Sequence, residues 1–252
     1  MLQQAFKNYA KEYDRHFTNS LIGKAQRNIV HKHLQSILKN VTSILEVNCG
    51  TGEDAVIFTN QGKKIIATDI SPQMIQVAMS KNDKIDFRVC DATAIDTLEG
   101  SFDMIFSNFG GLNCIDKNQL TSFSEAANKK LNQNGLLALV FISSECVWEK
   151  YYFKLKGKEI RRNQKTAIAT IDNNSFATYY YSPKELEDIF NPFFKLVHLK
   201  PIGLFVPPSY MESKMVKNKW IFKILSALDY LFLNSTKLAN KADHFYLVFK
   251  KK

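Results

Sequence analysis

Apolar residues follow two different spacings along this 252-residue chain, and the change from one to the other marks its elements. Up to about residue 40 they recur at helical spacing, which predicts amphipathic helices. The positions concerned are Phe6, Tyr9, Ala10, Tyr13 and Phe17, and then Ile22, Ala25, Ile29, Val30 and Leu34. From residue 43 onward, short apolar runs alternate with helical segments, which predicts buried strands joined by helices.

The first five apolar runs are predicted strands: Ser43–Val47, Lys64–Thr68, Asp86–Cys90, Phe102–Ser107 and Leu136–Ile142. Helices are predicted at Glu53–Gln61, closed by Gly62, from Ser71-Pro72 onward, and at Gln119–Leu131. Ser71 suits a helix cap, and Pro72 suits the first helical position. Strands that alternate with helices at this spacing predict an α/β fold with a parallel, doubly wound sheet.

After residue 145 the pattern becomes less regular. Glu159–Arg162 and Phe176–Tyr181 are predicted to pair as a β excursion, and a helix is predicted to begin at Ser182-Pro183. Two more predicted strands complete the chain, Phe194–Leu199 and His244–Phe249.

An insertion, Pro201–Asp243, separates the last two predicted strands and contains an apolar helix. Pro207-Pro208 breaks any strand at its start. The helix carries one apolar stripe, made of Ile221, Ile224, Leu225, Leu228, Leu231 and Phe232, with Lys217, Lys219 and Lys223 near its beginning. This pattern predicts either a helix packed on the core or a cap on the substrate side of a site. Such a cap would line an apolar pocket or rest on an anionic membrane.

Composition narrows the class of protein. The four cysteines are far apart and form no C-x-x-C pair, which disfavours a zinc site or a disulfide framework. Met1–Phe17 lacks a leader pattern, and Trp220–Leu233 is too short to span a bilayer, so we expect a cytoplasmic protein. The net charge of +10 permits an anionic partner, but the lysines are scattered, which makes nucleic acid a less favoured partner than a small molecule.

The strongest candidate for a ligand site is the strand end at Glu46-Val47 with the glycine-rich turn Asn48–Gly52 that opens a helix. Glycines at Gly50 and Gly52 leave no Cβ between the backbone and a ligand. In open α/β sheets, ligands bind at the carboxyl ends of the strands, near the point where the strand order reverses. The turn therefore stands where a cofactor is expected.

Two cofactor classes are compatible with this turn. The spacing Gly-x-Gly-x-x-Ala also fits a dinucleotide fingerprint, with Asp69 near the expected ribose position. However, Glu46 precedes the turn, and Glu53 and Asp54 follow it, so a pyrophosphate would meet carboxylates. Glu53 and Asp54 are sufficiently explained as partners of the helix dipole, whereas Glu46 is not. The charges favour a ligand that carries an ammonium and a sulfonium over NAD.

Acidic residues also end the next two strands. Asp69 follows the second strand, where a carboxylate can accept hydrogen bonds from both ribose hydroxyls, and Asp91 follows the third, near an expected adenine amino group. A single aspartate at a strand end is commonly a turn former or cap. Three successive strands ending in Glu46, Asp69 and Asp91 indicate ligand binding instead.

These motifs resemble the successive cofactor motifs of class I S-adenosylmethionine (SAM)-dependent methyltransferases. The similar segments are Glu46-x-Asn48-x-Gly50-x-Gly52, Asp69-Ile70-Ser71-Pro72-Gln73-Met74 and Cys90-Asp91-Ala92. The similarity covers residues 40 to 145 well and is closest to the small-molecule branch that includes ubiquinone/menaquinone-type enzymes. The family's first turn glycine is Asn48 here, and asparagine tolerates positive φ better than other non-glycine residues.

The resemblance implies a Rossmann-like, seven-stranded, mostly parallel sheet whose last strand is antiparallel. It implies one methyltransferase domain over residues 1–252, with a helical lid at 1–40, a SAM-binding core at 41–145, and substrate-side excursions and last strands at 146–252, including the cap at 201–243. It also implies cofactor-binding roles for a set of residues: Tyr13, Glu46, Asn48, Cys49, Gly50, Gly52, Asp69, Ile70, Met74, Asp91, Ala92 and Asn108.

Methyl transfer from a sulfonium is an in-line displacement in which positioning supplies much of the rate. No catalytic base stands out, because the five histidines are isolated, and no acidic pair indicates a metal. Tyr9 and Tyr13 share a helix face and suit an aromatic lid as well as core packing. The leading prediction is a SAM-dependent methyltransferase for a small acceptor, apolar or anionic; an RNA methyltransferase and a non-catalytic SAM-binding protein remain alternatives. The substrate, acceptor atom and oligomeric state do not follow from the sequence.

Overall fold

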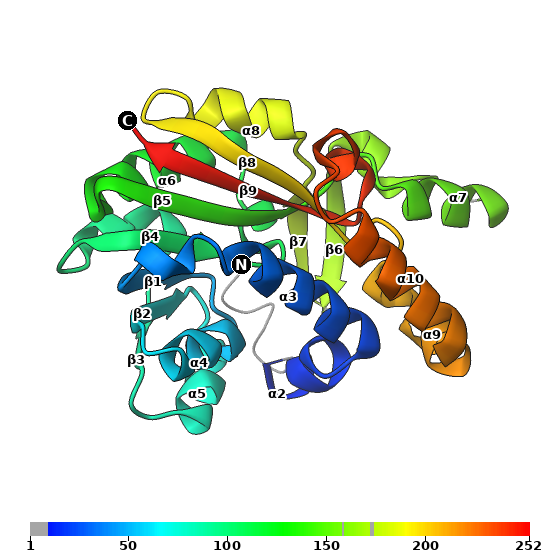
Figure 1. The fold of residues 1–252 in the computed structure, drawn as a ribbon, viewed down its shortest axis with the longest axis horizontal. Helices are drawn as coiled ribbons and strands as arrows, with labels where there is room; N and C mark the ends of the chain where they lie inside the picture. Colours follow the sequence, from blue (N-terminus) through cyan, green and yellow to red (C-terminus); the bar gives the residue numbers. More distant parts are fainter. Residues whose placement is uncertain (1–9, 158, 172–173) are drawn as a thin grey trace.

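The computed structural model describes residues 10–157, 159–171 and 174–252 (Figure 1). Its main sheet has seven strands in the order β3-β2-β1-β4-β5-β9-β8. Their bounds are β1 Ser43–Val47, β2 Lys64–Asp69, β3 Asp86–Val89, β4 Phe102–Ser107, β5 Leu131–Ile142, β8 Phe194–Ile202 and β9 His244–Lys251. Strand β9 runs antiparallel to both β5 and β8, while the pairs among β1 to β5 are parallel. The predicted mostly parallel sheet with an antiparallel last strand is confirmed.

Helices cover both faces of the sheet. They are α2 Ala10–Tyr13, α3 Leu21–Leu34, α4 Glu53–Asn60, α5 Pro72–Lys81, α6 Lys117–Lys130, α7 Val147–Leu155, α8 Pro183–Phe190, α9 Glu212–Lys217 and α10 Lys219–Leu231. One core layer packs Phe123 of α6 and Leu186 of α8 against the sheet, and the other packs Val30 of α3 and Phe58 of α4. The helical lead-in is confirmed from Ala10 onward, whereas Phe6 and Tyr9 lie outside the described residues.

The helix starts that the sequence predicted from local signals are confirmed. The Ser71 hydroxyl accepts a hydrogen bond from the Met74 amide at 3.3 Å, with Pro72 in the first turn of α5. Ser182 and Glu185 form a capping box at the start of α8. These starts depend on residues three positions apart, so the local sequence contains the whole signal.

The β excursion differs from its prediction in one of its two strands. The hairpin pairs β6 Thr166–Ile171 with β7 Asn174–Tyr179, and Glu159–Arg162 is not a strand. Arg162 lies in a 3-10 turn, where its buried guanidinium binds Glu149 at 2.8 Å and Asp243 at 2.5 Å. This segment is therefore fixed by a buried charge network rather than by backbone pairing.

The insertion after β8 also differs from its prediction. Pro201 and Ile202 belong to β8, so the insertion begins at Gly203. Helices α9 and α10 lie beside α3, where the Glu212 carboxylate accepts hydrogen bonds from the amides of Leu21 and Ile22 at 2.8 and 3.0 Å (Figure 1). Among the described residues, no helix is long and apolar enough to cross a membrane.

Candidate cofactor and acceptor pocket

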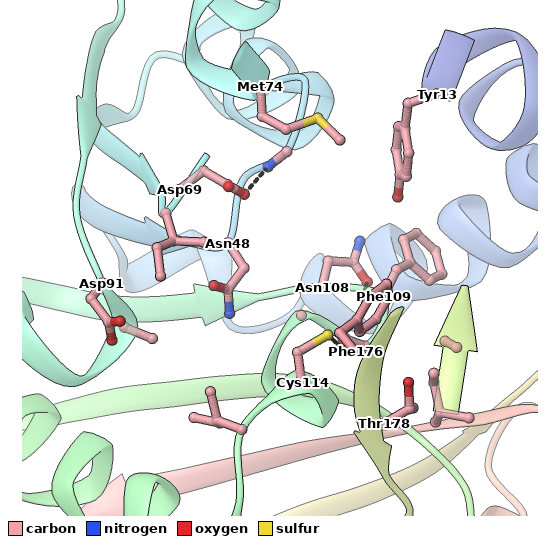
Figure 2. Close-up of a pocket in the computed structure, with 18 of the residues that line it drawn as sticks. Tyr13, Asn48, Asp69, Met74, Asp91, Asn108, Phe109, Cys114, Phe176 and Thr178 are labelled. Atoms are coloured by element: carbon pink, nitrogen blue, oxygen red, sulfur yellow. Dashed lines mark hydrogen bonds between the residues drawn. The ribbon is translucent and has the colours of Figure 1, made fainter. Parts of the chain in front are cut away.

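A cavity of about 460 Å³ opens where the parallel strands end (Figure 2). The strand order reverses between β1 and β4, which is where open α/β sheets bind ligands. Loops after β1, β2, β3 and β4 form one half of this cavity, which we call the strand-end half, with the lining residues Asn48, Gly50, Asp69, Ile70, Met74, Asp91, Ala92 and Asn108. The structure therefore brings most of the predicted site residues to one cavity.

The glycine-rich turn leaves open space at one position and is closely packed at another. Asn48, Gly50 and Gly52 all have positive φ, at 57°, 53° and 75°. A Cβ built on Gly50 would meet no atom within 4 Å, whereas one on Gly52 would lie 2.8 Å from Phe87 and 2.9 Å from Ala78. Gly50 therefore keeps the pocket open. Gly52 lies outside the lining and allows α4 to begin close to the core.

The carboxylate of Asp69 is held in place by two backbone amides. It accepts a hydrogen bond from Gly50 N at 2.9 Å (Figure 2) and another from Ser71 N at 2.8 Å. Burial raises the pKa of this carboxyl, and the two amides oppose that effect. Two fixed amide donors orient the side chain on the pocket wall and leave lone pairs of the carboxylate free to accept further hydrogen bonds.

Asp91 caps the 3-10 helix Ala92–Thr97 and also lines the pocket. One of its oxygens, Oδ1, accepts hydrogen bonds from the Thr93 amide at 2.8 Å and the Thr93 hydroxyl at 2.7 Å. Ala92 follows it in the same wall. Ile70 and Met74 bring apolar side chains to the same half of the cavity, and Met74 is buried.

Beside the main cavity lies a recess of about 30 Å³, which is lined by Glu46, Cys49, Asp54 and Arg27. The Oε2 oxygen of Glu46 is buried and has no hydrogen-bond partner within the described part of the chain. Burial raises the pKa of Glu46 well above its usual value, the Asp54 carboxylate raises it further, and Arg27 opposes both. An unpartnered buried acceptor costs free energy unless a donor reaches it. The recess therefore provides an acceptor for a small cationic group.

Asp54 has a larger role than the helix-dipole partner that the sequence suggested. Its buried carboxylate binds Arg27 at 2.5 Å, His31 at 2.7 Å and the Asn108 amide at 3.0 Å. These hydrogen bonds and charges hold the pKa of Asp54 far below its usual range, although burial acts in the opposite direction. The cluster connects α3, α4 and the end of β4, so it fixes the position of Asn108 at the pocket.

Arg27 is a site residue that the sequence analysis missed. Its guanidinium is buried, and its Nε atom has no hydrogen-bond partner among the described residues. The available signal was an arginine on the same apolar side of α3 as Val30 and Leu34, which are both buried. Helical periodicity alone does not show that this face meets Asp54, because that residue lies 27 positions further along the chain.

Side chains from distant segments form the second half of the cavity, which we call the hairpin half. Tyr13, Phe109, Ala169, Phe176 and Thr178 line it (Figure 2). Tyr13 points into the cavity from the N-terminal helix, opposite Phe109 after β4 and Phe176 on β7. Among the described lining residues the only charged side chains are Asp69 and Asp91, and both belong to the strand-end half. The hairpin half is therefore uncharged and mostly aromatic, and the hydroxyls of Tyr13 and Thr178 are its polar groups.

Phe109 has an unusual backbone conformation. Its φ is +46°, and a bulky residue with positive φ is a genuine outlier. Its ring contacts Phe17, with centroids 5.0 Å apart, and His244, with centroids 5.6 Å apart, and the Arg27 guanidinium lies 5.1 Å from its centre. The Asn108 side chain accepts a hydrogen bond from the Phe109 amide at 3.0 Å. Strain of this kind gathers at functional sites, where surrounding contacts maintain it.

The cap helix α10 does not line the cavity. From the segment 203–243 only Ser209 belongs to the described lining residues. The histidines His31, His33 and His244 also lie outside that lining: His31 binds Asp54, and the other two pack against Tyr246 and Phe109. The lining thus contains no imidazole in the part of the chain that the structure describes.

The chain matches the model of a methyltransferase domain over residues 44–135. That range covers β1 to the first part of β5, and it contains the glycine-rich turn, Asp69, Asp91 and Asn108.

Curated relatives include an uncharacterized protein and methyltransferases with different substrates. An uncharacterized protein of Methanocaldococcus jannaschii is 28% identical over 74% of this chain and 73% of its own length. A ribosomal protein L11 methyltransferase of Pelobacter propionicus is 30% identical over 41% of this chain and 33% of its own. A demethylmenaquinone methyltransferase of Renibacterium salmoninarum is 29% identical over 42% of this chain and 44% of its own. The match thus spans less than half the length of each of these two methyltransferases.

Solved structures share the whole fold. The PH0226 protein of Pyrococcus horikoshii superposes with a TM-score of 0.68 at 15% identity, over 98% of this chain and 100% of that one. A SAM-dependent methyltransferase of Clostridium acetobutylicum superposes with a TM-score of 0.62 at 13% identity, over 97% and 98%. Residues 44–135 thus match a methyltransferase domain, and the strand order together with this likeness shows that the chain has the fold of SAM-dependent methyltransferases.

Proposed function

We propose that the chain transfers the methyl group of SAM to a small, uncharged, apolar acceptor that lies in the hairpin half of the cavity. The observation that carries this proposal is the character of that half: Phe109, Phe176 and Ala169 line it, and the described residues bring no carboxylate, amine or imidazole to it. An apolar lining favours a ligand whose surface is apolar too, because burying that surface is the main source of affinity.

Two unpartnered groups support a place for the amino-acid part of SAM. Glu46 Oε2 is a buried acceptor and Arg27 Nε a buried donor, and both residues line the same recess. An amino acid presents an ammonium and a carboxylate, which need one acceptor and one donor of this kind. Open space beside Gly50 leaves room for the chain of atoms that leads from this recess to the main cavity.

The strand-end half supports a place for the adenosine. Asp69 would accept the ribose hydroxyls, since two amides already fix its orientation. Asp91 and Ala92 would bind the edge of the adenine ring, with Ile70 and Met74 packed on its face. The cavity volume of about 460 Å³ lies within the range of roughly 300–1,000 Å³ that small-molecule sites occupy.

When bound, SAM supplies a methyl group on a sulfonium, which is already a good leaving group. The protein then has to hold the acceptor in line, exclude water and avoid competing nucleophiles, and orientation of this kind contributes roughly 7–11 kcal/mol. Phe109, Phe176 and Tyr13 would form the walls that do so. Because this half contains no strong base, the acceptor atom must be nucleophilic without one, or lose its proton to water.

An aromatic ring of the ubiquinone or menaquinone type belongs to this class of acceptor. The motif resemblance and the matching segment of the demethylmenaquinone methyltransferase support it. The net charge of +10 supports the alternative of an RNA acceptor, but a nucleotide would bring phosphate to a cavity whose charged lining groups are carboxylates.

The test is a labelling experiment. The protein is incubated with methyl-labelled SAM and a cell extract, and the label is followed into a solvent-extractable fraction and an acid-insoluble fraction. We expect the label in the solvent-extractable fraction. Label in acid-insoluble RNA or protein would contradict the proposal.

Matched variants locate the acceptor in the hairpin half. Phe176→Ala should lower methyl transfer at least about tenfold, since a lost aromatic wall removes on the order of 2 kcal/mol of apolar contact. Affinity for S-adenosylhomocysteine (SAH) should stay unchanged, because Phe176 lies away from Asp69, Met74 and Asp91 (Figure 2). Val197→Ser, an exposed change on β8, is the control. Equal loss of SAH affinity in Phe176→Ala would contradict this placement.

A further inference from the structure

Helix α10 has an apolar ridge on the side that faces solvent. Trp220, Ile224, Ala227 and Leu231 are all exposed, with exposed fractions of 67% for Trp220, 52% for Ile224 and 76% for Leu231. Their spacing of four, three and four residues places them in one line along the helix. Scattered single apolar residues are normal on a protein surface, but a continuous line of them indicates a partner.

The ridge differs from the stripe that the sequence predicted. The opposite side of α10 packs on the protein: Leu225 lies against the cluster of Ile22, Val206 and Met215. Because α10 is apolar on both sides, it has the composition of a buried helix, yet its outer side is exposed.

Charge around the ridge has a single sign. Lys219 and Lys223 are exposed beside Trp220 and Ile224, and neither forms an ion pair with the described part of the chain. The single acidic residue of the helix, Asp229, points inward, where it is buried and accepts hydrogen bonds from the amides of Phe205 and Val206 at 2.8 and 3.0 Å. The outer side of α10 is therefore apolar and positively charged.

We infer that the outer side of α10 docks on an anionic lipid bilayer. An interfacial helix of this kind buries Trp and aliphatic side chains at the level of the headgroups, while flanking lysines bind anionic lipid. A second copy of the chain is the less favoured occupant, because two facing ridges would bring their lysines together. Helix α10 lies beyond the end of the sheet where the cavity opens, so docking would hold that end of the molecule at the lipid surface (Figure 1).

The experiment is co-flotation of the whole chain with vesicles. One set holds equal parts of phosphatidylglycerol and phosphatidylcholine, and the other holds phosphatidylcholine alone. We expect flotation with the anionic set at roughly 0.05 M salt, and much less at roughly 0.5 M or with the neutral set. Absence of flotation with the anionic set at low salt would overturn the inference.

Paired variants test which surface binds. Lys219→Glu/Lys223→Glu should lower the partition coefficient at least about tenfold, from roughly fivefold per lysine. The control Lys195→Glu/Lys250→Glu changes net charge equally at the opposite end of the sheet, and it should keep most of the binding. Equal losses in both pairs would mean that total charge, not α10, governs binding.

A second pair of variants tests the apolar ridge. Ile224→Ser/Leu231→Ser should lower partitioning at least about tenfold, while the control Val89→Ser/Val197→Ser, which also removes exposed apolar groups, should not. Thermal melting of each variant excludes unfolding as the cause. If the ridge variant floats as well as the natural protein, the inference is wrong.

Trp220 also reports insertion directly. In a Trp148→Phe background it is the single tryptophan, and its fluorescence should shift to the blue with anionic vesicles. Analytical ultracentrifugation distinguishes the other occupant: a dimer that disappears in Ile224→Ser/Leu231→Ser would assign the ridge to a second copy and overturn lipid docking. Vesicle binding requires no turnover, so its failure would leave the proposed methyl transfer intact.

Discussion

At the residue scale, Gly50 of the glycine-rich turn can be compared with Gly62, a glycine of similar backbone conformation. Gly50 and Gly62 both have positive φ, and a Cβ on either would meet nothing within 4 Å. They differ in that Gly50 lines the cavity and Gly62 lies at the end of α4.

We predict that Gly50→Ala and Gly62→Ala destabilise the protein by a similar amount, about 1–2 kcal/mol, because alanine is disfavoured at positive φ. Only Gly50→Ala should weaken SAH binding, by at least about tenfold, since its methyl group would stand in the cavity. Urea unfolding and calorimetric titration measure the two effects. Equal SAH affinity in the two variants would show that the turn does not approach the ligand.

Asp69 supplies a second test at this scale. Asp69→Asn should weaken SAH binding by about 10- to 100-fold, because charge-assisted hydrogen bonds to the ribose contribute about 1.5–3 kcal/mol. The exposed Asp188→Asn is the control of equal charge change and should bind normally. Unchanged SAH affinity in a folded Asp69→Asn variant would reduce Asp69 to a turn residue.

Single residues were predictable where the signal was local. Asp69 and Asp91 were found because each directly follows an apolar strand, and the structure places both on the cavity wall. Arg27 and the pairing role of Asp54 were not found, since each depends on a contact between segments far apart in sequence. Phe176 was expected in a strand, but nothing in the chain around it indicates a cavity.

At the element scale, the Asp14 carboxylate connects the N-terminal helix to the glycine-rich turn and to α5. Asp14 follows α2 and binds the Thr51 hydroxyl at 2.6 Å and the Lys81 ammonium of α5 at 2.5 Å. Burial alone would raise the pKa of Asp14, but the hydrogen bonds from Lys81 and Thr51 bring it below its usual value. We propose that these contacts of Asp14 with Thr51 and Lys81, which we call the Asp14 clasp, hold Tyr13 over the cavity as a lid.

Loosening the clasp should therefore speed cofactor release. Lys81 does not line the cavity, so Lys81→Met should raise the SAH dissociation rate severalfold, by about 1 kcal/mol for a partly buried ion pair. Lys84→Met, a neighbouring exposed change, is the control. Stopped-flow displacement of SAH gives both rates. Identical rates would show that the N-terminal helix is not a lid.

Elements were predictable from sequence where capping and periodicity suffice. The helix starts at Ser71 and Ser182 needed only residues within one turn. Glu159–Arg162 was wrongly predicted as a strand. Its conformation depends on the ion pair between Arg162 and Asp243, which lies 81 residues further along the chain, so the local sequence does not indicate it. The sequence predicted a single stripe on α10 and placed Ile224, Leu225 and Leu231 together in it. The structure divides that stripe between an inner and an outer side, because a helix that is apolar on two sides does not show which side faces the protein.

At the scale of the whole molecule, His33 connects the outer helix layer to the sheet. It lies on α3 and stacks on Tyr246 of β9, with ring centroids 5.4 Å apart and planes 9° from parallel. Burial lowers the pKa of His33 to about 4. Between that value and the unfolded value of about 6.5, the unfolded chain binds the proton and the folded chain does not, so folding stability falls as the pH falls.

We predict that the free energy of unfolding drops by about 2 kcal/mol from pH 7 to pH 5 through His33. His33→Phe keeps an aromatic ring on Tyr246 but removes the titration, so its drop should be smaller by that amount. His16→Gln, a change at an exposed histidine that does not contribute to the pKa shift of His33, is the control. Urea unfolding at the two pH values gives the comparison, and an equal drop in His33→Phe would contradict the assignment.

The fold was predictable at this scale because strand and helix alternate locally from residue 43 to residue 142. The acceptor was not, because the hairpin half gathers Tyr13, Phe109 and Phe176 from three separate parts of the chain. The net charge of +10 also did not indicate which surface binds an anionic partner. Lys219 and Lys223 indicate such a surface only because the structure places them beside the exposed apolar ridge of α10.

The most direct test of the two-part pocket is a crystal structure of the complex with SAH. We predict the ribose hydroxyls on Asp69, the adenine beside Asp91 and Ala92, the ammonium on Glu46, and the sulfur facing the hairpin half between Tyr13 and Phe176. Adenosine in the hairpin half, or an amino-acid part away from Glu46 and Arg27, would contradict this account of the site.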